Sequence, residues 1–106
     1  MNIQKMMQQA QAMQTKMQEL QERLGEMEVQ GMSGGGMVQV VMTCKGEVRK
    51  LTINPEVINP DDRETLEDLV MAAINAARAV ADNTMTEETQ KLMGQFGIPG
   101  GAKLPF

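Results

Sequence analysis

The reactive side chains of this sequence are carboxylates, amines and a single thiol, because the chain contains no histidine and one cysteine. The densest group of carboxylates lies at the start of a predicted helix and comprises Asp61, Asp62, Glu64, Glu67 and Asp68. The helix dipole favours negative charge there, so we interpret these residues as helix-start chemistry rather than as an acid/base pair. They lack the spacing of a calcium-binding loop, although whether they bind a partner or a metal stays open.

Other common sites are missing as well. The run Gly34–Gly36 lacks the Lys-Ser/Thr of a phosphate-binding loop and precedes a strand. Cys44 has no second cysteine to pair with, which indicates a packed side chain in a reducing compartment. No apolar run approaches the roughly 18 residues of a membrane span. The sequence therefore predicts a cytoplasmic protein that is not an enzyme, with no cofactor, no metal, no membrane and no small-molecule substrate.

The positive charges are segregated although the net charge is −4. Residues 1–18 carry Lys5 and Lys16 without an acid, and residues 89–106 carry Lys91 and Lys103 without an acidic side chain. The acids concentrate in residues 19–36 and 56–88. Two chains related by a dyad would present paired basic ends, which is one way for an acidic protein to hold DNA. The alternative is that these are ordinary solvated lysines.

The first 28 residues carry a strict heptad pattern. Its apolar positions are spaced alternately by three and four residues and are Ile3, Met6, Ala10, Met13, Met17, Leu20, Leu24 and Met27. This pattern predicts an amphipathic helix capped by Asn2, about 40 Å long at 1.5 Å per residue. A compact domain of this size has a diameter of about 33 Å, so one end must project or meet another chain. We expect a homodimer; the alternative is a helix packed wholly on its own sheet.

A small sheet is predicted next. Gly31–Gly36 marks a turn, with Val29 and Gln30 beginning a short edge strand, and alternating residues then predict a hairpin of 38–44 and 47–53 around a two-residue turn, Lys45-Gly46. One face is expected to pack and the other to be partly wet. The expected cross-strand pairs are Cys44–Glu47, Met42–Arg49, Val40–Leu51 and Val38–Ile53.

A second long helix follows. Asn59 and Pro60 predict its start, and apolar residues from Leu66 to Ala81 give it a wide face that lies across the sheet, with alanines allowing close packing. Around Asn83–Glu88 the helix either continues or restarts. We therefore expect one α+β domain over residues 1–93, with a flexible Gly/Pro-rich tail over 94–106.

The order of these features resembles the YbaB/EbfC family of bacterial nucleoid-associated proteins over nearly the whole length. Four stretches carry the resemblance: Met6–Gln14, the glycine-rich turn entering Val38–Val40, Leu66–Ala77, and the ending Lys103–Phe106. The resemblance implies an α-β-β-β-α, tweezer-like homodimer that binds double-stranded DNA in the nucleoid.

If the resemblance holds, five cations are candidate DNA contacts. Lys5, Lys16 and Lys91 are the stronger candidates, and Arg23 and Arg78 the weaker ones. This sequence departs from the family pattern in having only Arg78 where some relatives carry a basic cluster in the second helix. We expect contacts mainly to backbone phosphates with weak sequence preference, since no aromatic stacking residue or arginine-rich recognition helix is present. The alternative function is a protein-interaction adaptor whose methionine-rich helix grips a partner without direct DNA binding.

Overall fold

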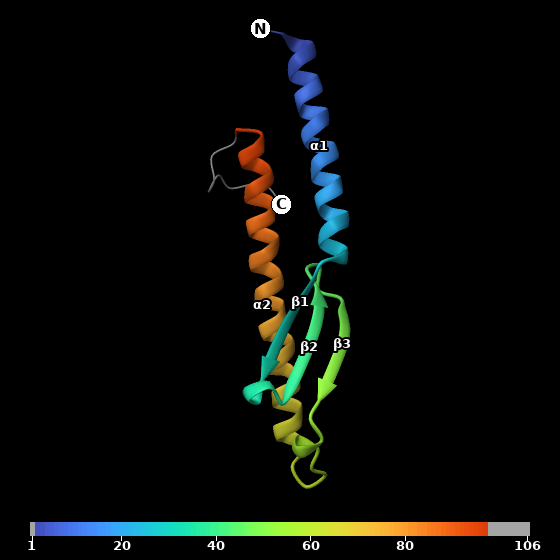
Figure 1. Ribbon diagram of the computed structural model, residues 1–106, viewed down its shortest axis with the longest axis vertical. Helices are drawn as coiled ribbons and strands as arrows, with labels where there is room; N and C mark the ends of the chain where they lie inside the picture. Colours follow the sequence, from blue (N-terminus) through green and yellow to red (C-terminus); the bar gives the residue numbers. More distant parts are fainter. Residues whose placement is uncertain (1, 98–106) are drawn as a thin grey trace.

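The computed structural model describes residues 2–97 and has the predicted α+β architecture, with two long helices and a three-stranded antiparallel sheet (Figure 1). The molecule is elongated, with extents of 71 × 22 × 18 Å. Its elements in chain order are α1 Ile3–Glu26, β1 Glu28–Ser33, the 3-10 turn η1 Gly34–Gly36, β2 Val38–Thr43, β3 Val48–Ile53, the 3-10 turn η2 Pro55–Val57, and α2 Arg63–Gln95.

The sheet has the order β1-β2-β3, and α2 covers β1 and β2 on one face. Val38 and Val40 lie opposite Ile53 and Leu51, as predicted. The predicted pairing of Met42 with Arg49 is wrong, because a register shift between Val41 and Met42 places Val48 opposite Met42.

The loop between β2 and β3 also differs from the predicted two-residue turn. The Gly46 N–H donates to the Thr43 carbonyl at 3.0 Å, and the Thr43 N–H donates to the Glu47 carbonyl at 2.8 Å. Gly46 has a φ of 95°, which glycine adopts readily. The predicted two-residue turn and the Cys44–Glu47 pair are therefore wrong. The Cys44 N–H instead donates to the Met27 carbonyl at 3.0 Å, just past the end of α1.

The main core lies between the sheet and α2. Val38, Val40 and Met42 from β2 are buried against a row of alanines on α2, namely Ala73, Ala77 and Ala81. Gly31 of β1 lies opposite Val40 on the same face. A Cβ at Gly31 would be 2.2 Å from the Ala77 nitrogen and 2.6 Å from the Ala73 carbonyl oxygen. The predicted close packing through alanines is thus matched by a glycine that sequence analysis assigned to a turn.

The start of α2 differs from the prediction by a few residues. Asp62 is the N-cap, because its carboxylate accepts from the Thr65 N–H at 3.3 Å. The expected cap, Asn59, accepts instead from the Asp61 N–H at 3.0 Å and shapes the turn before the helix. From Arg63 the helix continues without a restart to Gln95, past the predicted boundary at residue 93. Residues 98–106, including Lys103 and most of the predicted tail, lie outside the described residues.

A second, smaller core joins the two helices. Leu20 and Leu24 of α1 are buried with Cys44 and Leu92. Burial raises the pKa of the Cys44 thiol above its usual value, and the nearby charge of Glu88 adds to this effect.

Beyond this contact α1 runs on alone, and its beginning extends past the end of α2 (Figure 1). Ile3 is 68% exposed, Met6 55% and Met7 65%. The prediction that one end of this helix projects is confirmed. We call residues 2–16 the arm.

The contact at Gly31 is testable by adding one methyl group. We expect Gly31→Ala to lower the free energy of unfolding by about 2 kcal/mol or more, because the Cβ meets backbone atoms that cannot move aside. Gly25→Ala is the matched control: it lies in α1 with open space around it and should be neutral or stabilising by up to about 1 kcal/mol. Urea denaturation measures both. Equal stability of the two variants would contradict the assigned role of Gly31.

Candidate nucleic-acid interface

Three of the predicted DNA-contacting residues lie on one line along α1. Lys5, Lys16 and Arg23 are separated by 11 and 7 residues. At 100° per residue these spacings keep all three within about 20° of one another, over roughly 27 Å of helix. We call this line the basic ridge. All three residues are exposed. The Asn2 side chain starts the helix by accepting from the Lys5 N–H at 3.3 Å.

The last turns of α2 lie beside the ridge and bring Lys91 to it. The packing of Leu20 on Leu92 holds the two helices together there. Between them is an open cleft of about 260 Å³. Its lining residues are Lys16, Glu19, Leu20, Arg23, Glu88, Lys91, Leu92 and Gln95. The structure therefore brings together three of the five predicted residues, Lys16, Arg23 and Lys91.

A carboxylate between the helices partly neutralises this group. Glu88 accepts from the Arg23 guanidinium at 2.8 Å and lies 3.5 Å from the Lys91 ammonium group. Its side chain is 19% exposed, so it is held between α1 and α2 rather than extended into solvent. Sequence analysis missed Glu88 because it is 65 residues from Arg23.

The remaining cations of the ridge are less constrained. Lys16 pairs with Glu19 at 3.4 Å, but both side chains are more than half exposed. Such pairs contribute little and are easily exchanged. Within residues 2–97, Lys5 makes no ion pair. Lys5 and Lys16 are thus the cations of the ridge that are most accessible to an anionic ligand.

Arg78 lies apart from the other four. Its guanidinium is next to Gly46 in the β2–β3 loop and pairs with Asp82 at 3.5 Å. The structure does not bring it to the basic ridge, and its role in DNA binding stays a prediction.

Arg49 is a positioning residue that sequence analysis also missed. From β3 it donates to the Gly25 carbonyl at 3.3 Å, at the end of α1. It also pairs with Glu26 at 3.8 Å and with Glu47 at 3.3 Å. These contacts tie the C-terminal end of α1 to the sheet, and so help to set the direction in which the arm projects.

Other kinds of site find little support in the described part of the chain. Over residues 2–97, no three histidine, cysteine or acidic side chains are grouped so that they could hold a metal ion. No helix in that range combines the length and apolarity needed to cross a membrane. The predicted acidic stretch forms the surface around the start of α2.

The fold is shared with a solved structure, an uncharacterized protein from Helicobacter pylori. The TM-score is 0.74, the match covers 89% of this chain and 99% of the other, and the sequences are 22% identical. This similarity defines the class of protein as an α+β chain in which two long helices flank a three-stranded antiparallel sheet.

The sequence comparisons are more specific. Residues 1–96 match the YbaB/EbfC DNA-binding family. A nucleoid-associated protein of Rhodospirillum centenum is 49% identical over 105 residues, covering 99% of this chain and 98% of that protein. A nucleoid-associated protein of Caldanaerobacter subterraneus is 48% identical over 99 residues, covering 93% and 89%. The chain therefore belongs to the YbaB/EbfC DNA-binding family, and the resemblance found in the sequence is confirmed.

The bridging position of Glu88 leads to a test of the interface. We expect Glu88→Gln to raise affinity for duplex DNA about fivefold or more at low salt and to steepen the salt dependence, because Arg23 and Lys91 lose their partner. Stability should change by less than about 1 kcal/mol, since Arg23 is 58% exposed.

The control for this variant is Glu64→Gln, which makes the same charge change at the far end of α2. It should alter affinity little. Fluorescence anisotropy at several salt concentrations measures both. An equal gain in the two variants would mean that only net charge matters, and would exclude the cleft as part of the interface.

Proposed function

We propose that this protein is a nucleoid-associated, non-enzymatic protein that binds duplex DNA, mainly through backbone phosphates and with weak sequence preference. The observation that carries the proposal is the basic ridge of Lys5, Lys16 and Arg23, with Lys91 beside it on α2. Membership of a DNA-binding family and the names of the relatives support the same function. In a bacterial cell it would act at the nucleoid and affect nucleoid organisation or gene expression.

The distribution of charge explains how a protein with a net charge of −4 can bind a polyanion. Most acids belong to the second half of α1 and to residues 56–88. The arm itself contains no acidic side chain. Because exposed charges are screened within about 10 Å at 0.1 M salt, DNA at the arm experiences the lysines more than the carboxylates of the body, with Glu19, 3.4 Å from Lys16, as the exception.

We also propose that the protein acts as a homodimer. Leu51 lies opposite Val40 and faces the same side of the sheet, yet it is 46% exposed, because α2 lies over β1 and β2 rather than β3. Val48, at the other end of the same strand, is equally exposed. A second copy packed against β3 would cover this apolar edge and would place two arms on one particle. Two ridges double the number of phosphates contacted.

The salt dependence of binding tests the DNA proposal. If about 4 to 8 phosphates are neutralised per dimer, the slope of log K against log salt should be roughly −4 to −7. Lys5→Glu with Lys16→Glu should reduce the magnitude of the slope by about 3 to 4, because two contacts per protomer are lost.

Arg63→Glu serves as the control for charge reversal, since Arg63 begins α2 far from the arm. It should leave the slope nearly unchanged. Absence of binding at low salt would overturn the proposal and leave the adaptor function, for which the exposed Ile3, Met6 and Met7 are the supporting observation.

The dimer proposal is tested by the mass in solution. Sedimentation equilibrium should give twice the chain mass of 11.7 kDa. Leu51→Glu should shift the equilibrium toward the monomer by about tenfold or more, because it buries a charge in the proposed interface. Thr52→Glu, on the opposite face of β3, should have a smaller effect. A wild-type mass equal to one chain would exclude the homodimer.

A further inference from the structure

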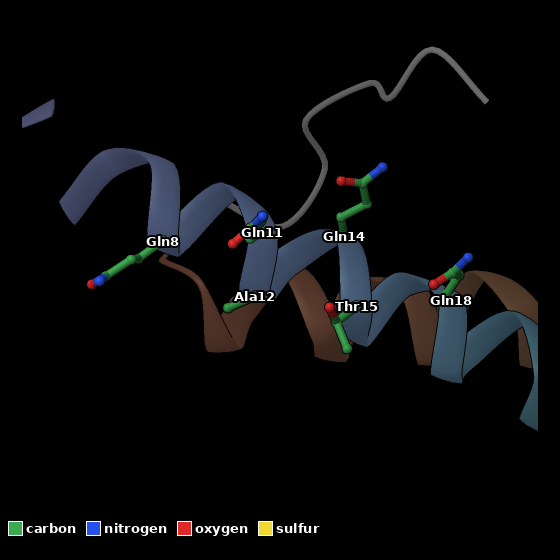
Figure 2. A pocket seen from close by; sticks show the side chains of 6 residues that line it. All are labelled: Gln8, Gln11, Ala12, Gln14, Thr15 and Gln18. Atoms are coloured by element: carbon green, nitrogen blue, oxygen red, sulfur yellow. The ribbon is translucent and has the colours of Figure 1, made fainter. Parts of the chain in front are cut away.

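The first half of α1, from the arm to Gln18, carries an uncharged polar face next to Lys5 and Lys16. Gln8, Gln11, Thr15 and Gln18 are spaced by three, four and three residues, which places them on one side of α1. All four are exposed. They line a shallow groove along the helix together with Ala12 and Gln14 (Figure 2). We call these four residues the glutamine face.

The position of this face is set by the other surfaces of α1. At 100° per residue, Gln8 and Thr15 lie about 60° to 100° from the line of Lys5 and Lys16, and Gln11 and Gln18 lie about 120° to 160° from it in the same direction. The apolar positions that lead to Leu20 and Leu24, and hence to α2, lie on a different side of the helix. The glutamine face is therefore open to a ligand that approaches the basic ridge. Glu19 and Glu22 end the uncharged region toward the body of the protein.

We infer that the glutamine face lies in the major groove of DNA and reads base edges there, giving the protein a preference for A·T pairs. This inference rests on the proposed function. The ligand is duplex DNA because the stretch of α1 from Lys5 to Lys16, which contains no acid, is complementary to phosphates. An α-helix fits the major groove, which is about 12 Å wide.

The amide groups of the glutamines determine which bases the face would prefer. A glutamine amide both donates and accepts, and it pairs with the N6 and N7 atoms of adenine in the major groove. Ala12, beside Gln8 and Thr15 in the same groove, offers a methyl group for contact with the thymine methyl. Lys5 and Lys16 would meanwhile fix the register by contacting phosphates on one wall of the groove.

The preference should be modest in size. Each well-formed glutamine–adenine pair discriminates by roughly 5-fold to 150-fold, but the glutamine face belongs to a single helix. We expect a ratio of about 10-fold to 100-fold between preferred and scrambled DNA. This ratio is small beside the factor of about 1,000 or more that is typical of specific regulators, and it agrees with the weak preference of the proposed function.

The test uses the full chain and a pool of random duplexes. Wild-type protein should enrich A·T-containing sequences, and anisotropy then gives its affinity for the enriched sequence and for a scrambled one. The triple variant Gln8→Ala, Gln11→Ala and Gln18→Ala should bring the ratio of the two affinities close to one. Its affinity for scrambled DNA and its salt slope should stay as in the wild type, because the lysines are unchanged.

Controls separate the possible failures. Alanine is the strongest helix former, and the three glutamines are exposed, so the arm should stay folded, which circular dichroism checks. Gln30→Ala, on the exposed side of β1, should keep the wild-type ratio. Base reading would be overturned if the wild type bound DNA in a salt-dependent way without enriching any sequence. It would also be overturned if the triple variant kept the enrichment. Either result would leave the proposed function intact. Absence of binding by the wild type would overturn both.

Discussion

The close contact of α2 with β1 at Gly31 is the constraint on which the rest of the structure depends. Because the alanines of α2 and the hydrogen atom of Gly31 allow backbones to meet, the helix lies flat along β1 and β2. A straight helix held in this way carries its last turns beyond the sheet, where Leu92 reaches Leu20 and Leu24. The cleft lined by Arg23, Glu88 and Lys91 lies between the two helices beside this contact, so it too depends on how α2 packs on the sheet.

The arm is exposed because the buried contacts of α1 with the rest of the chain are made near its C-terminal end, at Leu20 and Leu24. The second core and the bond from Arg49 to the Gly25 carbonyl hold only the end of the helix. The remaining turns are stabilised by helix propensity, the Asn2 cap and their own hydrogen bonds, without burial. Ile3, Met6 and Met7 are exposed close together near the start of this helix, and clustered exposed apolar residues are typical of contact surfaces. Under the proposed function, the lysines of the arm face the phosphates of DNA.

The attraction of this protein to phosphates depends on where its cations lie relative to its acids, and not on its net charge. Glu88 pairs with two cations and holds them at the body of the protein, whereas Lys5 and Lys16 belong to the arm, which contains no acidic side chain. Exposed lysines of this kind attract phosphates strongly only when salt is low. The proposed binding is therefore readily reversible and weakens as the salt concentration rises.

Local patterns in the sequence determined the elements: the heptad spacing from Ile3 defines α1, alternation defines the strands, and the alanine-rich face of α2 indicates its packing side. The segregated charges, together with the family resemblance, also made Lys5, Lys16 and Lys91 candidate DNA contacts, and that role stays a prediction. Only the tertiary structure decided the role of Gly31, the bulge that pairs Met42 with Val48, and the pairing of Arg23 with Glu88. These features depend on the distance between backbones or on residues far apart in the chain, and no periodicity within one segment encodes either.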